Sequence, residues 1–117
     1  MIYTASSYPL ALLERLAHWS GALPAKQHYV EVVIPAGVGY EEFAPDLHIG
    51  WNDPNGEVAA DFGSRWLMEV RSAILFVPSA IALMAQNILV NPLHPQAQRI
   101  VPGREKPVPW DRRLLRN

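Results

Sequence analysis

The run Ala-Ile-Leu-Phe-Val at residues 73–77 decides the fold, because it is short, continuous and apolar. Arg71-Ser72 precedes it and Pro78-Ser79 follows it, which predicts a central strand that is buried on both faces. Ile88 to Val90 is a second run of the same kind and stops at Asn91-Pro92. Two such strands indicate a sheet that is covered on both sides.

A strand and a helix are predicted before this pair. Ile2-Tyr3-Thr4 is β-prone, Ser6 and Ser7 can cap the helix that follows, and Gly21 ends it. One broad side of that helix is expected to face the core, with Leu10 at its edge and Glu14 next to Leu10, at the border between core and solvent. The residues of that side are Leu12, Leu13, Leu16, Ala17 and Trp19.

Four further segments complete the prediction. His28 to Pro35 alternates as a strand does, with Val30, Val32 and Ile34 on one face, and Arg99 to Val101 is the best strand of the proline-rich tail. Glu41 to Gly56 carries prolines and turn residues and is expected to be a surface loop. Glu57 to Glu69 is expected to be a helix that gathers Val58, Phe62, Arg65 and Trp66 on one side. The fold class is α+β, with a mixed sheet and flanking helices.

Composition excludes several classes of function. The chain has 117 residues, which suits one domain over 1–117, and a net charge of −1 with both signs interspersed, unlike a duplex-binding surface. It has no cysteine, so disulfides, thiolate metal sites and cysteine nucleophiles are absent. Neither a signal peptide nor an apolar run long enough to span a bilayer is visible, so we expect a cytoplasmic protein that does not bind membranes.

Metal and dinucleotide motifs are weak. The four histidines, His18, His28, His48 and His94, never occur at the i, i+4 spacing that brings two imidazoles onto one helical face, so no metal site is expected. Gly37-Val38-Gly39 lacks the third glycine and the helix of a dinucleotide fingerprint and is better explained as a turn that ends a strand.

Glu14, Ser79 and Tyr3 are the candidate functional residues, and each has an ordinary alternative. Glu14 could face a cleft or be an exposed helical residue beside His18. Ser79 follows a buried strand, where sites often lie, yet it could simply cap the next helix. Tyr3 lies near Glu14 if strand and helix pack as neighbours, but a strand-end tyrosine is often half-buried filler. No histidine or lysine is placed to activate Ser79 as a nucleophile.

The chain resembles the RES family along most of its length. Ile2-Tyr3-Thr4 and the helix Leu10-Ala11-Leu12-Leu13-Glu14-Arg15-Leu16-Ala17-His18 are similar to the Val-Tyr-Thr strand and the Ala-Leu-Leu-Glu-x-Leu-x-His helix of that family. Further matches follow in the same order. They are Gly50-Trp51, Trp66-Leu67, Arg71-Ser72-Ala73, Val77-Pro78-Ser79-Ala80 and Asn87 through Asn91-Pro92-x-His94-Pro95.

The resemblance implies a fold similar to ADP-ribosyltransferases and a toxin of a type II toxin–antitoxin system, partnered by an Xre-type antitoxin. It implies NAD+ as substrate and cleavage of the nicotinamide–ribose bond, as an NAD+ glycohydrolase or phosphorylase that uses water or phosphate. Two alternatives stay open. One is a protein mono-ADP-ribosyltransferase, and the other is a catalytically impaired RES remnant that binds the antitoxin or forms a homo-oligomer.

The resemblance also assigns residues. Glu14 matches the family glutamate, Ser79 is preferred to Ser72 as the family serine, and Tyr3 matches a tyrosine that lines the nicotinamide pocket. Tyr3, Ser79 and Asn91 are expected to bind NAD+, with Glu14 and Ser79 catalytic. The family arginine would lie before Met1, so the RES domain is expected to be incomplete at its N-terminus. Three arginines could replace that charge if one reached the pocket mouth: Arg15, Arg65 and Arg71.

Overall fold

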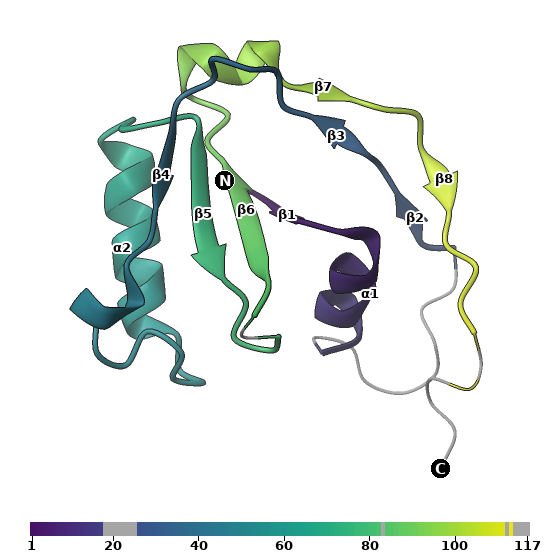
Figure 1. The fold of residues 1–117 in the computed structure, drawn as a ribbon, viewed down its shortest axis with the longest axis horizontal. Helices are drawn as coiled ribbons and strands as arrows, with labels where there is room; N and C mark the ends of the chain where they lie inside the picture. The colour runs from purple at the N-terminus through teal and green to yellow at the C-terminus, as the bar shows by residue number, and fades with distance from the viewer. Residues whose placement is uncertain (18–25, 83, 112, 114–117) are drawn as a thin grey trace.

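The computed structural model describes residues 1–17, 26–82, 84–111 and 113. Its centre is a four-stranded mixed sheet in the order β1-β6-β5-β4 (Figure 1). β5 pairs antiparallel with β6 and parallel with β4, while β1 pairs antiparallel with β6. The strands are β1 (Ile2–Ala5), β4 (Tyr40–Glu42), β5 (Ile74–Pro78) and β6 (Gln86–Val90). The predicted α+β class is confirmed, and the arrangement is consistent with an ADP-ribosyltransferase-like fold.

The two central strands carry the core on both faces, as their apolar runs predict. Ile74 and Val90 pack on one face with Val38, whereas Leu75 and Leu89 pack on the other with a second cluster. That second cluster contains Phe43 and Trp66. Full burial of an aliphatic side chain stabilises a fold by about 1.5–3 kcal/mol, so the buried side chains of these two strands contribute substantially to stability.

Helix α2 (Glu57–Met68) covers one face of the sheet (Figure 1). Phe62 and Trp66 lie one turn apart and face the core, and Trp66 is completely buried. The indole Nε1 of Trp66 donates to the hydroxyl of Ser72 at 2.9 Å, which joins the helix to the start of β5. Arg65 was predicted to share this side but is exposed beside Asp61, because its guanidinium would be costly to bury.

The end of α2 is closed by two backbone hydrogen bonds, from Val70 N to Leu67 O and from Arg71 N to Trp66 O. This is the pattern of a Schellman motif, whose penultimate residue adopts a left-handed conformation. Val70 occupies that position with φ of 51°. A β-branched residue is strained there, so the turn is stabilised by its hydrogen bonds against an unfavourable backbone conformation.

Helix α1 (Tyr8–Ala17) begins where predicted, and the Ser7 hydroxyl accepts a hydrogen bond from Leu10 N at 3.3 Å. The predicted face is partly wrong. Leu10 is its buried residue, whereas Leu13 and Ala17 are exposed. The reason is that α1 lies beside β1 at the edge of the sheet and not across a sheet face (Figure 1). The predicted contributions of His18, Trp19 and Gly21 lie outside the described residues.

A two-stranded ribbon arches around α1 (Figure 1). Strand β2 (His28–Tyr29) pairs with β8 (Lys106–Pro107), and β3 (Val32–Val33) pairs with β7 (Val101–Pro102). The predicted strand over His28 to Pro35 is therefore two short strands. The prediction for Arg99 to Val101 is wrong at its start, because Pro95–Arg99 forms the 3-10 helix η2, which His94 caps by accepting from Gln96 N.

The segment Glu41 to Gly56 is not entirely a loop as predicted. Its first two residues belong to β4, which pairs with β5, and Pro45–Leu47 forms the short helix η1. Glutamate is depleted in strands, so the Glu41-Glu42 pair conceals this edge strand in the sequence. Among the described residues, no helix is both long and apolar enough to cross a membrane.

Candidate functional site

Two polar side chains bind one carboxylate that lies far from both of them in the sequence. The hydroxyl of Ser79 donates to Oε1 of Glu14 at 2.6 Å, and the amide Nδ2 of Asn87 donates to the same oxygen at 2.9 Å. Glu14 and Ser79 are therefore brought together as the two candidate residues would need to be. Both donors bind Oε1, so neither of them holds the second carboxylate oxygen, Oε2.

The secondary structure explains this meeting. Glu14 lies one turn beyond the buried Leu10, so the same face of α1 that packs inward carries its carboxylate. Ser79 follows the last residue of β5, and Asn87 lies in β6 opposite Val77. The end of β5, the start of β6 and the middle of α1 thus supply one residue each.

Ser79 is fully engaged within the protein. Its side chain has no exposed surface, and its hydroxyl oxygen accepts hydrogen bonds from the backbone N–H groups of Ile81 and Ala82 at 3.2 and 3.0 Å. A serine hydroxyl has one proton, which here goes to Glu14. Ser79 is accordingly arranged to orient Glu14 and to fix the turn between β5 and β6.

A hollow of about 620 Å³ opens beside this carboxylate. We call it the Glu14 hollow; its lining residues are Tyr3, Thr4, Ala5, Ala11, Glu14, Arg15 and Asn87. Its volume lies in the range of small-molecule sites, about 300–1,000 Å³. Tyr3 is 73% exposed, so its ring is accessible at the wall of the hollow and is not core filler.

A second hollow of about 550 Å³ lies between β1, the start of α1 and the strands of the ribbon. It shares Tyr3, Thr4, Ala5 and Ala11 with the Glu14 hollow, so the two are neighbours across the β1–α1 corner. Tyr8 and Tyr29 meet edge to face at its wall, with ring centroids 4.6 Å apart. The edge-to-face contact of the two rings gives this hollow a defined apolar wall.

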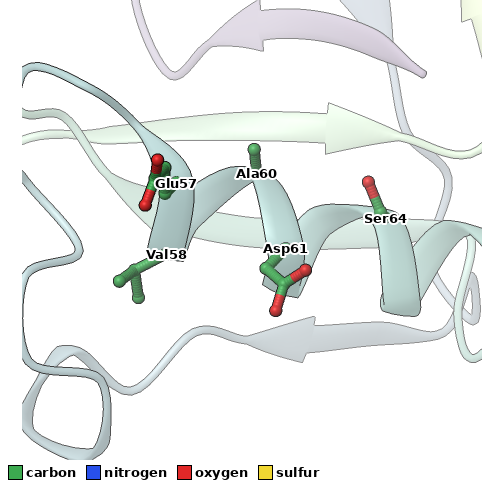
Figure 2. Close-up of a pocket in the computed structure, with 5 residues that line it drawn as sticks. All are labelled: Glu57, Val58, Ala60, Asp61 and Ser64. Carbon is green, nitrogen blue, oxygen red and sulfur yellow. The ribbon is translucent and has the colours of Figure 1, made fainter.

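A third, more open hollow of about 610 Å³ runs along α2 (Figure 2). Figure 2 shows its lining residues, all five of which belong to that one helix: Glu57, Val58, Ala60, Asp61 and Ser64. No second element brings a polar group toward Glu57 or Asp61 in this lining. The Glu14 hollow is the candidate site, since its polar groups come from several elements and, unlike the second hollow, it is lined by both Glu14 and its hydrogen-bond partner Asn87.

Comparison with known proteins identifies the family. A family model described as "RES domain" matches residues 1–111. The chain belongs to the RES domain family. It is 39% identical over 121 residues to a protein of Sphingobium sp. named "Prs ADP-ribosylating toxin". That alignment covers 99% of this chain and 75% of the Sphingobium protein.

Two further relatives of this RES domain are named "Toxin Res". The protein of Pseudomonas putida is 35% identical over 101 residues, or 84% of this chain and 68% of its own length. The protein of Yersinia enterocolitica is 31% identical over 99 residues, or 83% of this chain and 65% of its own length. The chain thus spans between about two thirds and three quarters of the relatives that it matches.

Ser72 and Asn91, the other polar candidates of this RES domain, have structural contacts. The Ser72 hydroxyl accepts from Trp66 and donates to Ile74 O at 2.6 Å. The Asn91 amide donates to Leu67 O at 3.1 Å, its oxygen accepts from Leu93 N at 3.0 Å, and the side chain is completely buried. Neither residue lines the Glu14 hollow. Binding of NAD+ by Asn91 stays a prediction, with no contact that favours it.

The three arginines named above as possible phosphate-binding residues have different surroundings. Arg15 lines the Glu14 hollow. Arg65 lies on the exposed side of α2 within 3.7 Å of Asp61, and Arg71 forms a two-pronged hydrogen-bonded pair with Glu41 at the β4 edge. Arg15 is thus the arginine that the RES domain brings to the candidate site.

The histidines are engaged separately. His28 lies 3.4 Å from Glu105, His48 stacks on Phe43, and His94 caps η2, while His18 lies outside the described residues. In the described part of the chain, no three histidine or carboxylate side chains gather as a metal site. Hydrogen bonds from Arg113 lower the pKa of the Asp111 carboxyl, but this exposed pair lies outside the Glu14 hollow.

Asn87 is the site residue that sequence reasoning missed as a candidate. It is 73 positions from Glu14, and no local pattern connects two residues so far apart. One signal was available: Asn87 is a polar residue that directly precedes the buried run Ile88 to Val90. A polar side chain beside a buried strand needs a partner, and here the partner is a carboxylate.

Proposed function

We propose that this RES domain uses NAD+ as substrate and breaks the bond between nicotinamide and ribose in the Glu14 hollow. The observation that carries the proposal is the Glu14 carboxylate, held on Oε1 by Ser79 and Asn87 at the wall of a hollow of suitable size. The name of the relative that is 39% identical describes ADP-ribosylation, a reaction that consumes NAD+, and so supports the same substrate class.

Glu14 would act by its charge. When the C1′–N bond breaks, nicotinamide leaves with the bonding electron pair as a neutral molecule, and positive charge develops on the ribose. A carboxylate oxygen beside C1′ stabilises that charge or binds the ribose hydroxyls, and no general acid is needed for the departing base. The acceptor oxygen then bonds to C1′ and loses its proton to solvent.

Ser79 and Tyr3 would support this step in different ways. Ser79 donates its one proton to Glu14 and thereby orients the carboxylate. Tyr3 is exposed at the wall of the hollow and offers an aromatic face on which the nicotinamide ring can stack. Arg15 lines the same hollow and offers a positive charge for the pyrophosphate.

The acceptor of ADP-ribose divides the proposal into two candidates. Water or phosphate would make the chain an NAD+ glycohydrolase or phosphorylase. A protein acceptor would make it an ADP-ribosyltransferase, which the name of the Sphingobium relative favours. Both candidates require the same cleavage at Glu14 and differ only in the second half of the reaction.

The biological role proposed is that of a toxin. Relatives from two organisms are named "Toxin Res", and loss of NAD+ or modification of an essential protein would stop growth. We propose that the chain acts in the cytoplasm, where NAD+ is available, and that an Xre-type antitoxin restrains it.

The test is incubation of the purified chain with NAD+ labelled in the adenosine half. Parallel reactions contain buffer alone, inorganic phosphate, or a soluble bacterial protein extract, and released nicotinamide is followed in each. We expect nicotinamide release, with label in free ADP-ribose, in its phosphate ester, or on protein, according to the acceptor. No release under any condition would contradict the proposal and favour a remnant that only binds an antitoxin.

A further inference from the structure

Asn87 combines two features that a purely structural residue would not need. Its amide nitrogen donates to Glu14, while its amide oxygen, Oδ1, is buried without a hydrogen-bond partner among the described residues. A buried oxygen with no partner destabilises the folded state and calls for an explanation. Asn87 also lines the Glu14 hollow, so the explanation concerns the site.

We infer that Asn87 is a positioning residue for the Glu14 carboxylate, an inference that rests on the proposed function. The orientation of its amide is fixed by chemistry, because a carboxylate only accepts hydrogen bonds and must face the NH₂ group. Turning the amide over would satisfy Oδ1 no better and would place two oxygens against each other. The unpartnered oxygen is therefore the consequence of holding Glu14.

Two donors from different parts of the sheet, one after β5 and one in β6, fix the orientation of the carboxylate. Ser79 follows β5 and Asn87 lies in β6, and both donate to Oε1 of Glu14. One hydrogen bond would leave the carboxylate free to rotate about that bond, whereas two restrict the plane of the group and so the direction of Oε2. Preorganised charge of this kind contributes to catalysis because it is not reoriented during the reaction.

The test compares three variants of the whole chain. Asn87→Ala removes the donor, and Asn87→Asp keeps the size but places a carboxylate opposite Glu14. Gln86→Ala is the matched control, because Gln86 is the neighbouring amide of β6, is exposed, and does not line the Glu14 hollow. Nicotinamide release gives kcat and KM for NAD+ from pH 5 to pH 8, and thermal unfolding shows whether each variant is folded.

We expect Asn87→Ala to lower kcat about ten- to hundredfold with little change in KM, the scale of one lost hydrogen bond to a charged group. Asn87→Asp should be less active still at pH 8, where two carboxylates repel each other. As the pH falls, the pair takes up one proton and the acid O–H can donate to Glu14, so activity relative to wild type should rise roughly tenfold. The other ionisable groups lining the hollow, Tyr3 and Arg15, are common to both proteins.

Each remaining outcome has one meaning. An Asn87→Ala chain with the wild-type kcat, or an Asn87→Asp chain whose pH profile parallels that of the wild type, would overturn the positioning role alone. If Asn87→Ala does not fold, the nearly isosteric Asn87→Asp chain decides. A wild-type chain that releases no nicotinamide would overturn the proposed function and this inference together.

Discussion

Replacing Ser79 by alanine should affect stability and activity through the same hydroxyl. The change removes the hydrogen bond to Glu14 at 2.6 Å and leaves the N–H groups of Ile81 and Ala82 without their acceptor. A hydrogen bond to a charged group contributes about 1.5–3 kcal/mol and a neutral one about 0.5–1.5 kcal/mol. Because water can reach the exposed Ile81, we expect a loss of about 2–4 kcal/mol in the free energy of unfolding.

Two assays measure these effects. Thermal unfolding should show a midpoint lowered by on the order of 10 °C, and kcat for nicotinamide release should fall at least about tenfold. A double-mutant cycle with Glu14→Ala isolates the shared interaction, and its coupling energy should be about 1–3 kcal/mol. A coupling energy near zero would refute the reasoning, because it would mean that the two side chains stabilise the fold independently.

Three other substitutions test separate parts of the structure. Tyr3→Ala should weaken NAD+ binding by roughly 1–3 kcal/mol, the scale of one stacking contact, and so raise KM, while Tyr3→Phe should leave KM unchanged; a Tyr3→Ala chain with the wild-type KM would remove the stacking role. Val70→Gly should raise the free energy of unfolding by about 1 kcal/mol by relieving the left-handed valine, and a lower unfolding temperature would contradict that account. Ser72→Ala should cost about 1–3 kcal/mol of stability by leaving the buried Trp66 Nε1 unpaired, yet keep kcat; a large fall in kcat would instead favour Ser72 as the site serine.

The central sheet could be predicted because its signal is local. A short apolar run such as residues 73–77 has only one good environment, between two covered faces, and β5 occupies it. The start of α1 could also be predicted from the local sequence, since Ser7 caps the helix with its own side chain. Strand β4 could not be predicted from the local sequence, because glutamates are uncommon in strands. Its Glu41-Glu42 pair is accommodated at the edge of the sheet by pairing with β5 and by the contact of Glu41 with Arg71.

The candidate site was predicted in part for the same reason. Glu14 and Ser79 could be named from the resemblance, but their hydrogen bond depends on where α1 packs, which the helix pattern misjudged by favouring Leu13 over Leu10. The position of Asn87 before a buried run indicates that it needs a partner, but its contact with Glu14 depends on the pairing of β6 with β1 and β5. Contacts between residues far apart in the chain follow from topology, and periodicity alone does not give topology.

The most direct test of the central claim is the rate of nicotinamide release from NAD+ by the wild-type chain and by Glu14→Gln. The variant keeps an oxygen that Ser79 and Asn87 can bind but loses the charge, so it should fold. Glu57→Gln, at an exposed position of α2, is the matched control (Figure 2). We predict that Glu14→Gln lowers the rate by about 10²–10³-fold while Glu57→Gln does not, the scale of one removed electrostatic stabiliser. Release by Glu14→Gln at the wild-type rate would contradict the account.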